Sequence, residues 1–293
     1  MKHKSGFVSI VGNPNVGKST LMNGLVGEKL SIITSKMQTT RHRIKGIVNG
    51  DDFQIIYSDT PGILKPNYKL QESMLKFVDS ALVDADVILY VTDVFERWDK
   101  NQEYLEKLQA TDTPILLVIN KIDISDQDTV NQLIKDWQER LPKAEILVIS
   151  ALRKFNLNYI FDRIVEHLPE APPYFEKDQL TDKSERFFVQ EIIREKILVH
   201  YKKEIPYSVE IEVEEFKEEP DIIKIRAIIH VIRSSQKGII IGHQGLGLRR
   251  VGTEARKDME EFFGKQVFLK TIVKVNKDWR DKDNQLKNFG YNE

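Results

Sequence analysis

The chain has 293 residues, of which 41% are hydrophobic and 30% are charged, a composition typical of soluble globular proteins with room for two domains. No apolar run approaches the roughly 18 residues that a membrane-spanning helix needs. Cysteine is absent, which excludes disulfides and thiolate metal sites, so we expect a cytoplasmic protein. The net charge of −1 argues against a strongly basic nucleic-acid-binding protein, and we expect no binding to DNA.

Through residue 168, apolar runs alternate with amphipathic stretches. We expect strands at 7–11, 44–49, 53–58, 87–93, 115–120 and 146–149, and helices at 18–26, 72–83, 101–108, 128–139 and 157–167. This alternation predicts an α/β fold, with a doubly wound, mostly parallel sheet covered by helices on both faces and the strand at 44–49 at an edge. We therefore expect a first domain of residues 1–168.

Clustered prolines then break the alternation. Pro169, Pro172 and Pro173 disfavour helix and favour an extended connection, so we expect a linker at 169–183. The order of elements changes after this linker, to a helix, two strands, a helix and a strand, which we expect at 184–201, 207–216, 222–231, 246–263 and 267–274. This order predicts a small α+β domain that, with a C-terminal tail, covers residues 184–293.

A glycine-rich turn leaves the first expected strand and opens the first expected helix. It consists of Gly12, Asn13, Pro14, Asn15, Val16, Gly17, Lys18, Ser19 and Thr20. In such a loop the backbone N–H groups and the helix N-terminus bind phosphate, Lys18 neutralises the β and γ oxygens, and the Ser19 hydroxyl ligates Mg²⁺. The turn predicts a nucleoside triphosphate site but does not distinguish ATP from GTP.

A second motif follows the strand at 53–58 and consists of Asp59, Thr60, Pro61 and Gly62. Asp59 is expected to hold Mg²⁺ through water, and the Gly62 N–H to contact the γ-phosphate. A plain turn explains this short pattern equally well.

The polar segment 34–43 lies between these two motifs and lacks a clear period, as is typical of a mobile switch loop. A threonine hydroxyl here would complete the Mg²⁺ shell when the γ-phosphate is present. We expect Thr40 to have this role, with Thr39 as the alternative.

The third and fourth motifs concern the base. They consist of Asn120, Lys121, Ile122 and Asp123, and of Ser150, Ala151 and Leu152. The Asp123 carboxylate offers two acceptors to the N1–H and N2 donors of guanine, and a backbone N–H of the fourth motif suits guanine O6. All four motifs follow expected strands, where ligands bind in open α/β sheets. Together they resemble the translation-factor-related class of Ras-like GTPases, which implies binding and hydrolysis of GTP.

Ile63 stands where Ras-like GTPases carry the glutamine that orients the attacking water. An aliphatic side chain cannot do this, so we expect slow intrinsic hydrolysis with Lys18, Thr40 and Gly62 as catalytic groups. Related GTPases with asparagine at the position of Asn15 use it to bind K⁺ near the phosphates. This resemblance implies a K⁺ site at Asn15.

A glycine loop in the second domain consists of Ile241, Gly242, His243, Gln244 and Gly245. Such a loop alone is most simply a turn, but the surrounding order of elements favours a type II KH module, whose loop clamps single-stranded RNA. Arg249, Arg250 and Lys257 would supply positive charge. His243 and Gln244 stand where KH loops often carry lysine or arginine, which should lower the salt dependence of binding.

Seven segments resemble the Era family, bacterial GTPases with an N-terminal G domain and a C-terminal KH domain. These segments are 12–20, 38–43, 59–62, 120–123, 192–196, 206–209 and 252–259. The resemblance implies Mg²⁺-dependent GTP hydrolysis that controls binding of the 3′ region of 16S rRNA during small (30S) ribosomal subunit assembly, and peripheral association with the cytoplasmic membrane. The alternatives are a P-loop kinase, which Asn120–Asp123 disfavour, and a GTPase whose main partner is protein or membrane.

Overall fold

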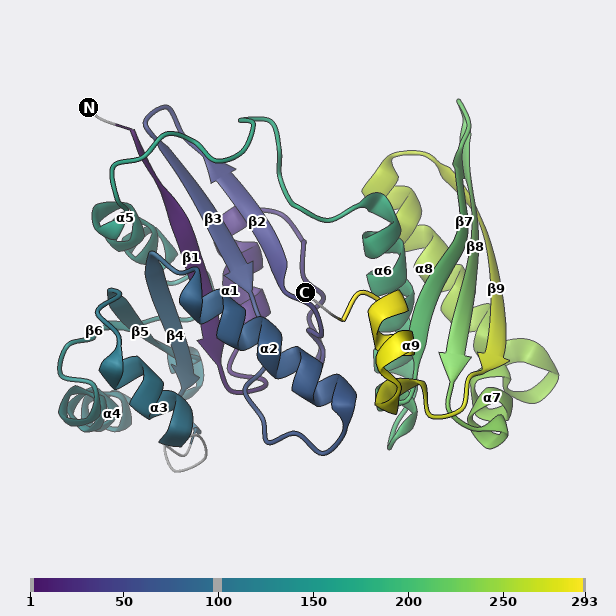
Figure 1. Ribbon diagram of the computed structural model, residues 1–293, viewed down its shortest axis with the longest axis horizontal. Coiled ribbons are helices and arrows are strands. Elements are labelled where there is room, and N and C mark those ends of the chain that lie inside the picture. Colours follow the sequence, from purple (N-terminus) through teal and green to yellow (C-terminus); the bar gives the residue numbers. More distant parts are fainter. Residues whose placement is uncertain (1–2, 97–101, 292–293) are drawn as a thin grey trace. The chain divides into compact units, whose positions relative to one another are not determined.

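The computed structural model describes residues 3–96 and 102–291, so Asn101, the first residue of one expected helix, lies outside the described residues. The chain divides into two compact units, one of residues 1–66 and 74–182 and the other of residues 67–73 and 183–293 (Figure 1). None of the helices in the described ranges combines the length and the apolar character needed to cross a membrane.

The first unit contains a six-stranded sheet in the order β2-β3-β1-β4-β5-β6. Every neighbouring pair is parallel except β2 and β3, which are antiparallel and place β2 at an edge. β4 and β5 are buried along their whole length, as expected of parallel strands covered on both faces. The sheet confirms the predicted doubly wound fold. Its strands are β1 (Lys4–Gly12), β2 (Ile44–Asn49), β3 (Phe53–Asp59), β4 (Val87–Asp93), β5 (Ile115–Asn120) and β6 (Glu145–Val148).

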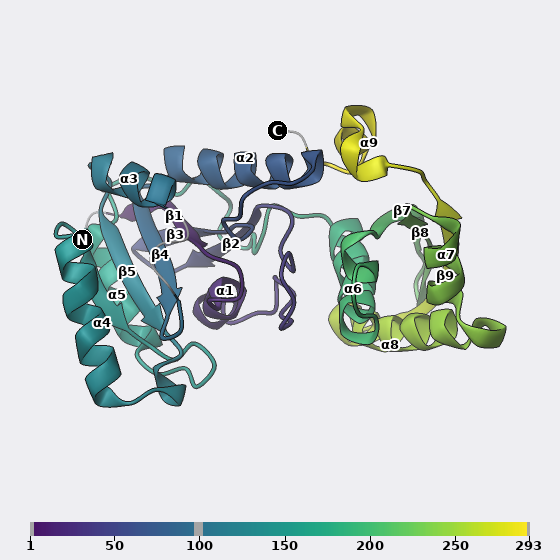
Figure 2. The same ribbon diagram turned by 90° about the horizontal axis from the view of Figure 1, so that it is seen from below.

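Helices cover both faces of this sheet. Val78, Leu108 and Trp137, from α2, α3 and α4, pack in one apolar cluster with the sheet. α1 lies on the other side of the sheet from α2 and α3 (Figure 2), and it touches α5, since a Cβ at Gly24 would lie 2.9 Å from Leu157. The helices are α1 (Lys18–Val26), α2 (Lys69–Val83), α3 (Gln102–Ala110), α4 (Gln127–Arg140) and α5 (Leu157–His167).

The expected linker at 169–183 is bound to the first unit as far as Asp182. The buried side chain of Gln54 accepts hydrogen bonds from the N–H groups of Tyr174 (2.7 Å) and Phe175 (2.9 Å). Farther along, the Ile47 N–H donates to the Leu180 carbonyl (2.8 Å). The segment therefore follows the outer edge of β2.

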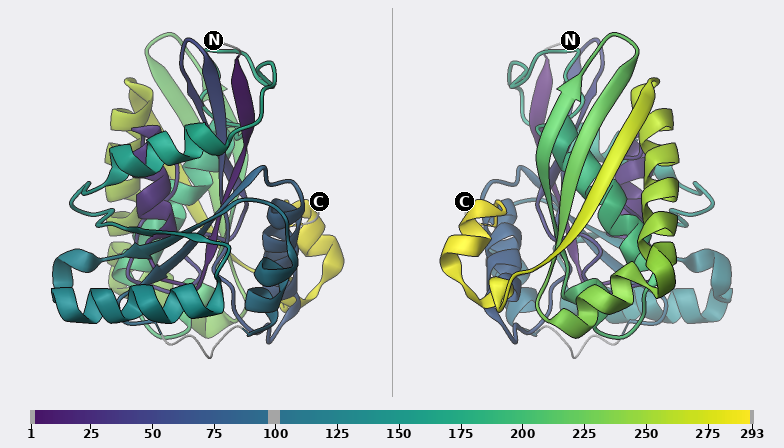
Figure 3. Two further views of the ribbon diagram at one scale, coloured as in Figure 1. Left: turned by 90° about the vertical axis from the view of Figure 1, so that its left-hand side faces the viewer. Right: turned by 90° about the vertical axis from the view of Figure 1, so that its right-hand side faces the viewer.

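The second unit contains a three-stranded sheet in the order β7-β8-β9, with β8 antiparallel to β7 and parallel to β9 (Figure 3, right). Ile193 of α6, Ile240 of α7 and Ala255 of α8 pack in one apolar cluster with Ile229 of β8, so the three helices share one face of the sheet. The elements are α6 (Glu185–His200), β7 (Glu210–Glu218), β8 (Ile222–Val231), α7 (Ser234–Ile241), α8 (Leu246–Phe263) and β9 (Gln266–Val275).

Several elements differ from the sequence-based expectation. β1 and α2 begin three residues earlier than expected, at Lys4 and Lys69. β7 begins at Glu210 and not at 207, because Ile205–Tyr207 forms a short 3₁₀ turn that contains Pro206, whose ring fixes φ. In addition, α7 is not predicted from the sequence. The Gln236 side chain, which accepts the N–H groups of Ile232 and Arg233 (both 3.0 Å), stabilises the start of this helix.

The C-terminal segment is an integral part of the second unit. It forms a 3₁₀ turn, η5 (Trp279–Asp281), and a short helix, α9 (Asp283–Asn288). The Trp279 side chain is fully buried, and its indole N–H donates to the Ser208 carbonyl (3.1 Å). The Tyr291 hydroxyl donates to the Glu210 carboxylate (2.6 Å). These contacts fasten the segment to the start of β7.

We expect Trp279→Ala to destabilise the second unit by about 3–5 kcal/mol, because it leaves a cavity and removes the hydrogen bond to Ser208. Urea unfolding followed by far-ultraviolet circular dichroism should show an earlier transition, whereas GTP binding by the first unit stays intact. Lys277→Ala, at an exposed position nearby, is the control. An unchanged transition in Trp279→Ala would contradict this integral role.

Candidate nucleotide site and glycine loop

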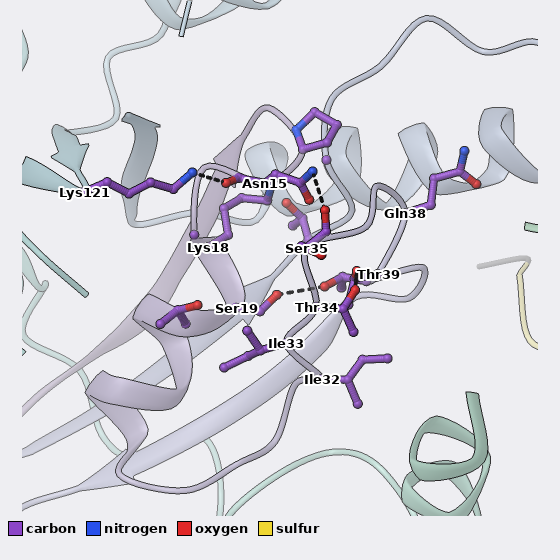
Figure 4. Close-up of a pocket in the computed structure, with 16 residues that line it drawn as sticks. Asn15, Lys18, Ser19, Ile32, Ile33, Thr34, Ser35, Gln38, Thr39 and Lys121 are labelled. Carbon is purple, nitrogen blue, oxygen red and sulfur yellow. Dashed lines mark hydrogen bonds between the residues drawn. The ribbon is translucent and has the colours of Figure 1, made fainter. Parts of the chain in front are cut away.

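A cavity of about 460 Å³ opens where β1, β3 and β5 end (Figure 4). It brings together residues from three of the four predicted motifs and from the expected switch loop. Asp123 and the fourth motif do not line it. The lining residues are Pro14, Asn15, Gly17, Lys18, Ser19, Thr20, Ile32, Ile33, Thr34, Ser35, Gln38, Thr39, Thr40, Thr60, Gly62 and Lys121.

The glycine-rich turn needs its glycines for two reasons. Gly12 and Gly17 have φ values of 148° and 98°, a region that L side chains rarely adopt. In addition, a Cβ at Gly12 would lie 2.1 Å from the Val91 carbonyl oxygen, and one at Gly17 would lie 2.3 Å from Nδ2 of Asn120. The backbone therefore packs closely against β4 and β5, and α1 begins at Lys18, directly after Gly17.

The Lys18 ammonium lies inside this turn and donates to the carbonyls of Gly12 (3.0 Å) and Asn13 (2.8 Å). Burial lowers the pKa of Lys18 to about 8, although the negative charges of Asp59 and Glu96 oppose this shift. Lys18 is therefore a cation at neutral pH that lacks full solvation, which suits the neutralisation of phosphate oxygens.

Three oxygen-bearing side chains converge beside Lys18. The Ser19 hydroxyl donates to Oδ2 of Asp59 (2.7 Å), and the Thr40 hydroxyl lies 2.8 Å from Ser19 and 3.3 Å from the same carboxylate oxygen. Burial raises the pKa of Asp59, against the Ser19 hydrogen bond and the Lys18 charge. Oδ1 of Asp59 is buried and accepts no hydrogen bond from the described residues. An all-oxygen cluster with an unsatisfied carboxylate oxygen fits Mg²⁺.

Thr39 points to other partners. Its hydroxyl donates to the Lys36 carbonyl (2.7 Å) and lies 2.7 Å from the Thr34 hydroxyl. The switch loop is thus closed by its own hydrogen bonds, and the Asn15 amide reaches across to the Ser35 carbonyl (3.2 Å; Figure 4). The geometry brings Thr40 to Asp59 and keeps Thr39 within the loop.

The Asn120 side chain joins the loops on the base side. Its Oδ1 accepts the N–H groups of Lys121 (2.8 Å) and Ala151 (2.9 Å), and its Nδ2 donates to the Val16 carbonyl (2.9 Å). Guanine O6 is expected to bind a backbone N–H of the fourth motif, and of these N–H groups that of Ala151 bonds to Asn120 here. Asp123 is exposed in a 3₁₀ turn, η2 (Ile122–Ile124).

Several residues of this site are not predicted from the sequence. Ile32 and Ile33 line the cavity, and their only signal is their place directly before the polar loop. Asp93, at the end of β4, binds the Lys121 ammonium (2.6 Å), which also donates to the Asn15 carbonyl (2.6 Å). A lone aspartate at a strand end carries no recognisable spacing. Ile63, in contrast, is expected at this site from the sequence, and its side chain is buried in the apolar cluster that α2 to α4 share with the sheet.

The glycine loop of the second unit joins α7 to α8. Gly242 and Gly245 have φ values of 71° and 78° and enclose the exposed His243 and Gln244. A Cβ at Gly242 would lie 3.0 Å from the Gly247 nitrogen. The predicted basic residues Arg249, Arg250 and Lys257 follow on α8 and are exposed, and Ile241 ends α7.

Comparison with known proteins covers both units. A family of 50S ribosome-binding GTPases matches residues 7–121, and the KH domain family matches residues 204–280. GTPase Era of Thermoanaerobacter sp. (strain X514) is 45% identical over 99% of this chain and 97% of its own length. GTPase Era of Alkaliphilus metalliredigens is 44% identical over 99% of this chain and its own full length.

Two solved structures of Era proteins are also similar to this chain over nearly its full length. Era in complex with MgGDPNP and nucleotides 1506–1542 of 16S ribosomal RNA has a TM-score of 0.96 at 39% identity. A variant of Aquifex aeolicus Era bound to GDP·AlF₄⁻ has a TM-score of 0.95 at 39% identity. Each match covers 99% of this chain and 100% of the other.

The pKa of Lys18 predicts how nucleotide affinity depends on pH. Bound phosphates stabilise the ammonium and raise its pKa above the value of about 8 in the free protein. The complex therefore retains a proton that the free protein loses above pH 8. Through Lys18, the affinity for GDP should not change below pH 7 and should fall about fourfold between pH 7 and 8.5.

Titration calorimetry in buffers of different ionisation enthalpy measures this effect. Binding at pH 8.5 should take up a fraction of a proton, and binding at pH 6.5 should take up none through Lys18. An affinity that stays constant from pH 7 to 8.5 would contradict the lowered pKa of Lys18.

Proposed function

Because the chain belongs to the Era family of GTPases, we propose that its GTP cycle controls binding of the 3′ region of 16S rRNA during assembly of the small ribosomal subunit. The main support for this proposal is that one chain contains both a phosphate-binding turn with a guanine motif and a KH glycine loop. The similar Era structure with MgGDPNP and 16S rRNA supports the same pairing of ligands.

In the proposed nucleotide site, Lys18 and the backbone around it bind the phosphates, and Asp123 selects guanine. Ser19, Thr40 and Asp59 would hold Mg²⁺, which neutralises charge on the β and γ oxygens when bound. The Gly62 N–H would contact the γ-phosphate. Since Ile63 cannot orient water by hydrogen bonding, intrinsic hydrolysis should be slow.

Thr40 and Ser35 belong to the same loop, and each already bonds to a residue of the phosphate-binding turn. Thr40 lies 2.8 Å from Ser19, and the Ser35 carbonyl accepts from Asn15. Ligands that engage Ser19 and Asn15 would compete for these contacts and reposition the loop. We propose that this is how the nucleotide state is transmitted beyond the cavity.

In the proposed RNA site, the backbone at Gly242 and Gly245 approaches a phosphate, with charge from Arg249, Arg250 and Lys257. Ile241 and the exposed Leu246 would contact bases. His243 and Gln244 add no fixed charge, so fewer counterions should be released than with a basic loop. A membrane-bound fraction, which the family resemblance implies, stays a prediction.

We expect Gly242→Asp to weaken binding of RNA nucleotides 1506–1542 at least tenfold, because the substitution strains a φ of 71° and repels phosphate. Fluorescence anisotropy with the full chain measures this loss. GTP hydrolysis without RNA should stay at the wild-type rate. Gly238→Asp, with nothing within 4 Å of the added Cβ, adds the same charge to α7 and is the control. Undiminished RNA affinity in Gly242→Asp would overturn the RNA assignment.

A K⁺ site at Asn15 predicts faster GTP hydrolysis in K⁺ than in Na⁺ at equal ionic strength. Asn15→Ala should remove this difference, since the side chain next to the Ser35 carbonyl would no longer offer a ligand. Phosphate release measured in both salts tests the site. Equal rates of the wild type in K⁺ and Na⁺ would rule it out.

A further inference from the structure

The carboxyl end of α6 lies beside the start of α8. Lys196 of α6 pairs with Asp258 of α8, and His200 pairs with Glu254 (2.6 Å). Residue numbers therefore rise along α6 as they fall along α8, so the two helices are antiparallel. Tyr201, directly after α6, consequently reaches the end of α8 that the glycine loop enters.

The Tyr201 hydroxyl donates a hydrogen bond of 2.7 Å to the Ile240 carbonyl. This carbonyl belongs to the last turn of α7, where carbonyl groups have no partner within their own helix. Burial raises the pKa of Tyr201, so the hydroxyl stays protonated and remains a donor at neutral pH. The bond attaches the end of α7 to the end of α6.

Gly247, in the first turn of α8, packs against the same point. A Cβ at Gly247 would lie 2.8 Å from the Ile240 carbonyl oxygen and 2.9 Å from the Tyr201 hydroxyl. A Cβ at Gly242 would in turn lie 3.0 Å from the Gly247 nitrogen. The end of α7, the glycine loop and the start of α8 are thus in van der Waals contact around one hydroxyl group.

A second contact from α6 acts on the basic residues of α8. The Glu254 carboxylate accepts from His200 (2.6 Å) and from Arg250 (3.3 Å). The hydrogen bond from His200 lowers the pKa of Glu254, with a further contribution from Arg250, so the carboxylate stays ionised. The end of α6 therefore contacts both helices that border the loop.

We infer that Tyr201 is a positioning residue for the glycine loop, which its hydroxyl holds in the geometry that binds an RNA phosphate. The inference rests on the proposed RNA-binding function. It matters in this chain because His243 and Gln244 supply no fixed charge between the glycines. Phosphate binding at the loop then depends on how well the backbone N–H groups are aligned.

Tyr201→Phe in the full chain tests this role, because it removes one hydroxyl and keeps the ring. The affinity for RNA nucleotides 1506–1542 should fall about three- to tenfold, the range of one lost hydrogen bond. The slope of log affinity against log salt should not change, since no charge is lost. In contrast, Arg250→Gln should lower the slope by about 0.7, the value for one phosphate contact on a single strand.

Two further measurements separate positioning from a general loss of structure. The amide signals of Gly242 and Gly245 in ¹H–¹⁵N spectra of Tyr201→Phe should shift, and the fraction of protein active in stoichiometric titration should stay at the wild-type value. Tyr174→Phe, which removes a hydroxyl from the first unit, should bind RNA normally. Gly247→Ala should also weaken binding, because its Cβ would push α8 away from Ile240.

The outcomes distinguish this inference from the proposed function. Wild-type affinity in Tyr201→Phe, together with weak binding in Gly242→Asp, would overturn the positioning role alone. A weaker affinity explained entirely by a smaller active fraction would overturn it as well. Undiminished RNA affinity in Gly242→Asp would instead overturn the RNA-binding function on which the inference rests.

Discussion

The nucleotide site depends on the side-chain amide of Asn120. This one buried group bonds to the phosphate-binding turn through Val16, to the end of its own strand through Lys121, and to the loop after β6 through Ala151. Removing a partner from a buried amide leaves polar groups unsatisfied, at about 1–3 kcal/mol each. The relative positions of the three loops therefore depend on all three of these hydrogen bonds together. Gly17 must also lack a side chain, because a Cβ there would collide with the amide.

Much of the nucleotide site in the first unit could be predicted, because the positions of its functional residues follow from the order and direction of the strands. Each nucleotide motif begins where an apolar run ends, and parallel strands bring their carboxyl ends to one edge of a sheet. This is why Lys18, Ser19 and Asp59, far apart in sequence, could be expected at one site. The structure shows these three side chains together, with Thr40 beside them.

The features that could not be predicted depend on contacts between distant residues. α7 is short, and its run of isoleucines is as typical of a strand as of a helix. Trp279 gives no sign in the sequence that its indole reaches the Ser208 carbonyl. Tyr201 likewise ends a helix with no local signal for its bond to Ile240. In each case the deciding interaction is a tertiary contact, which local periodicity does not encode.

The segment 169–182, which lies along the outer edge of β2, affects whether copies of this chain can associate. An uncovered edge strand presents a row of free N–H and C=O groups, with which a strand of another chain can pair to form an intermolecular sheet. Here Leu180 accepts from Ile47, and the Thr181 hydroxyl donates to the Lys45 carbonyl (2.6 Å), so the edge is already occupied. Proteolytic removal of this segment would expose the edge of β2 and leave the first unit prone to self-association through that edge.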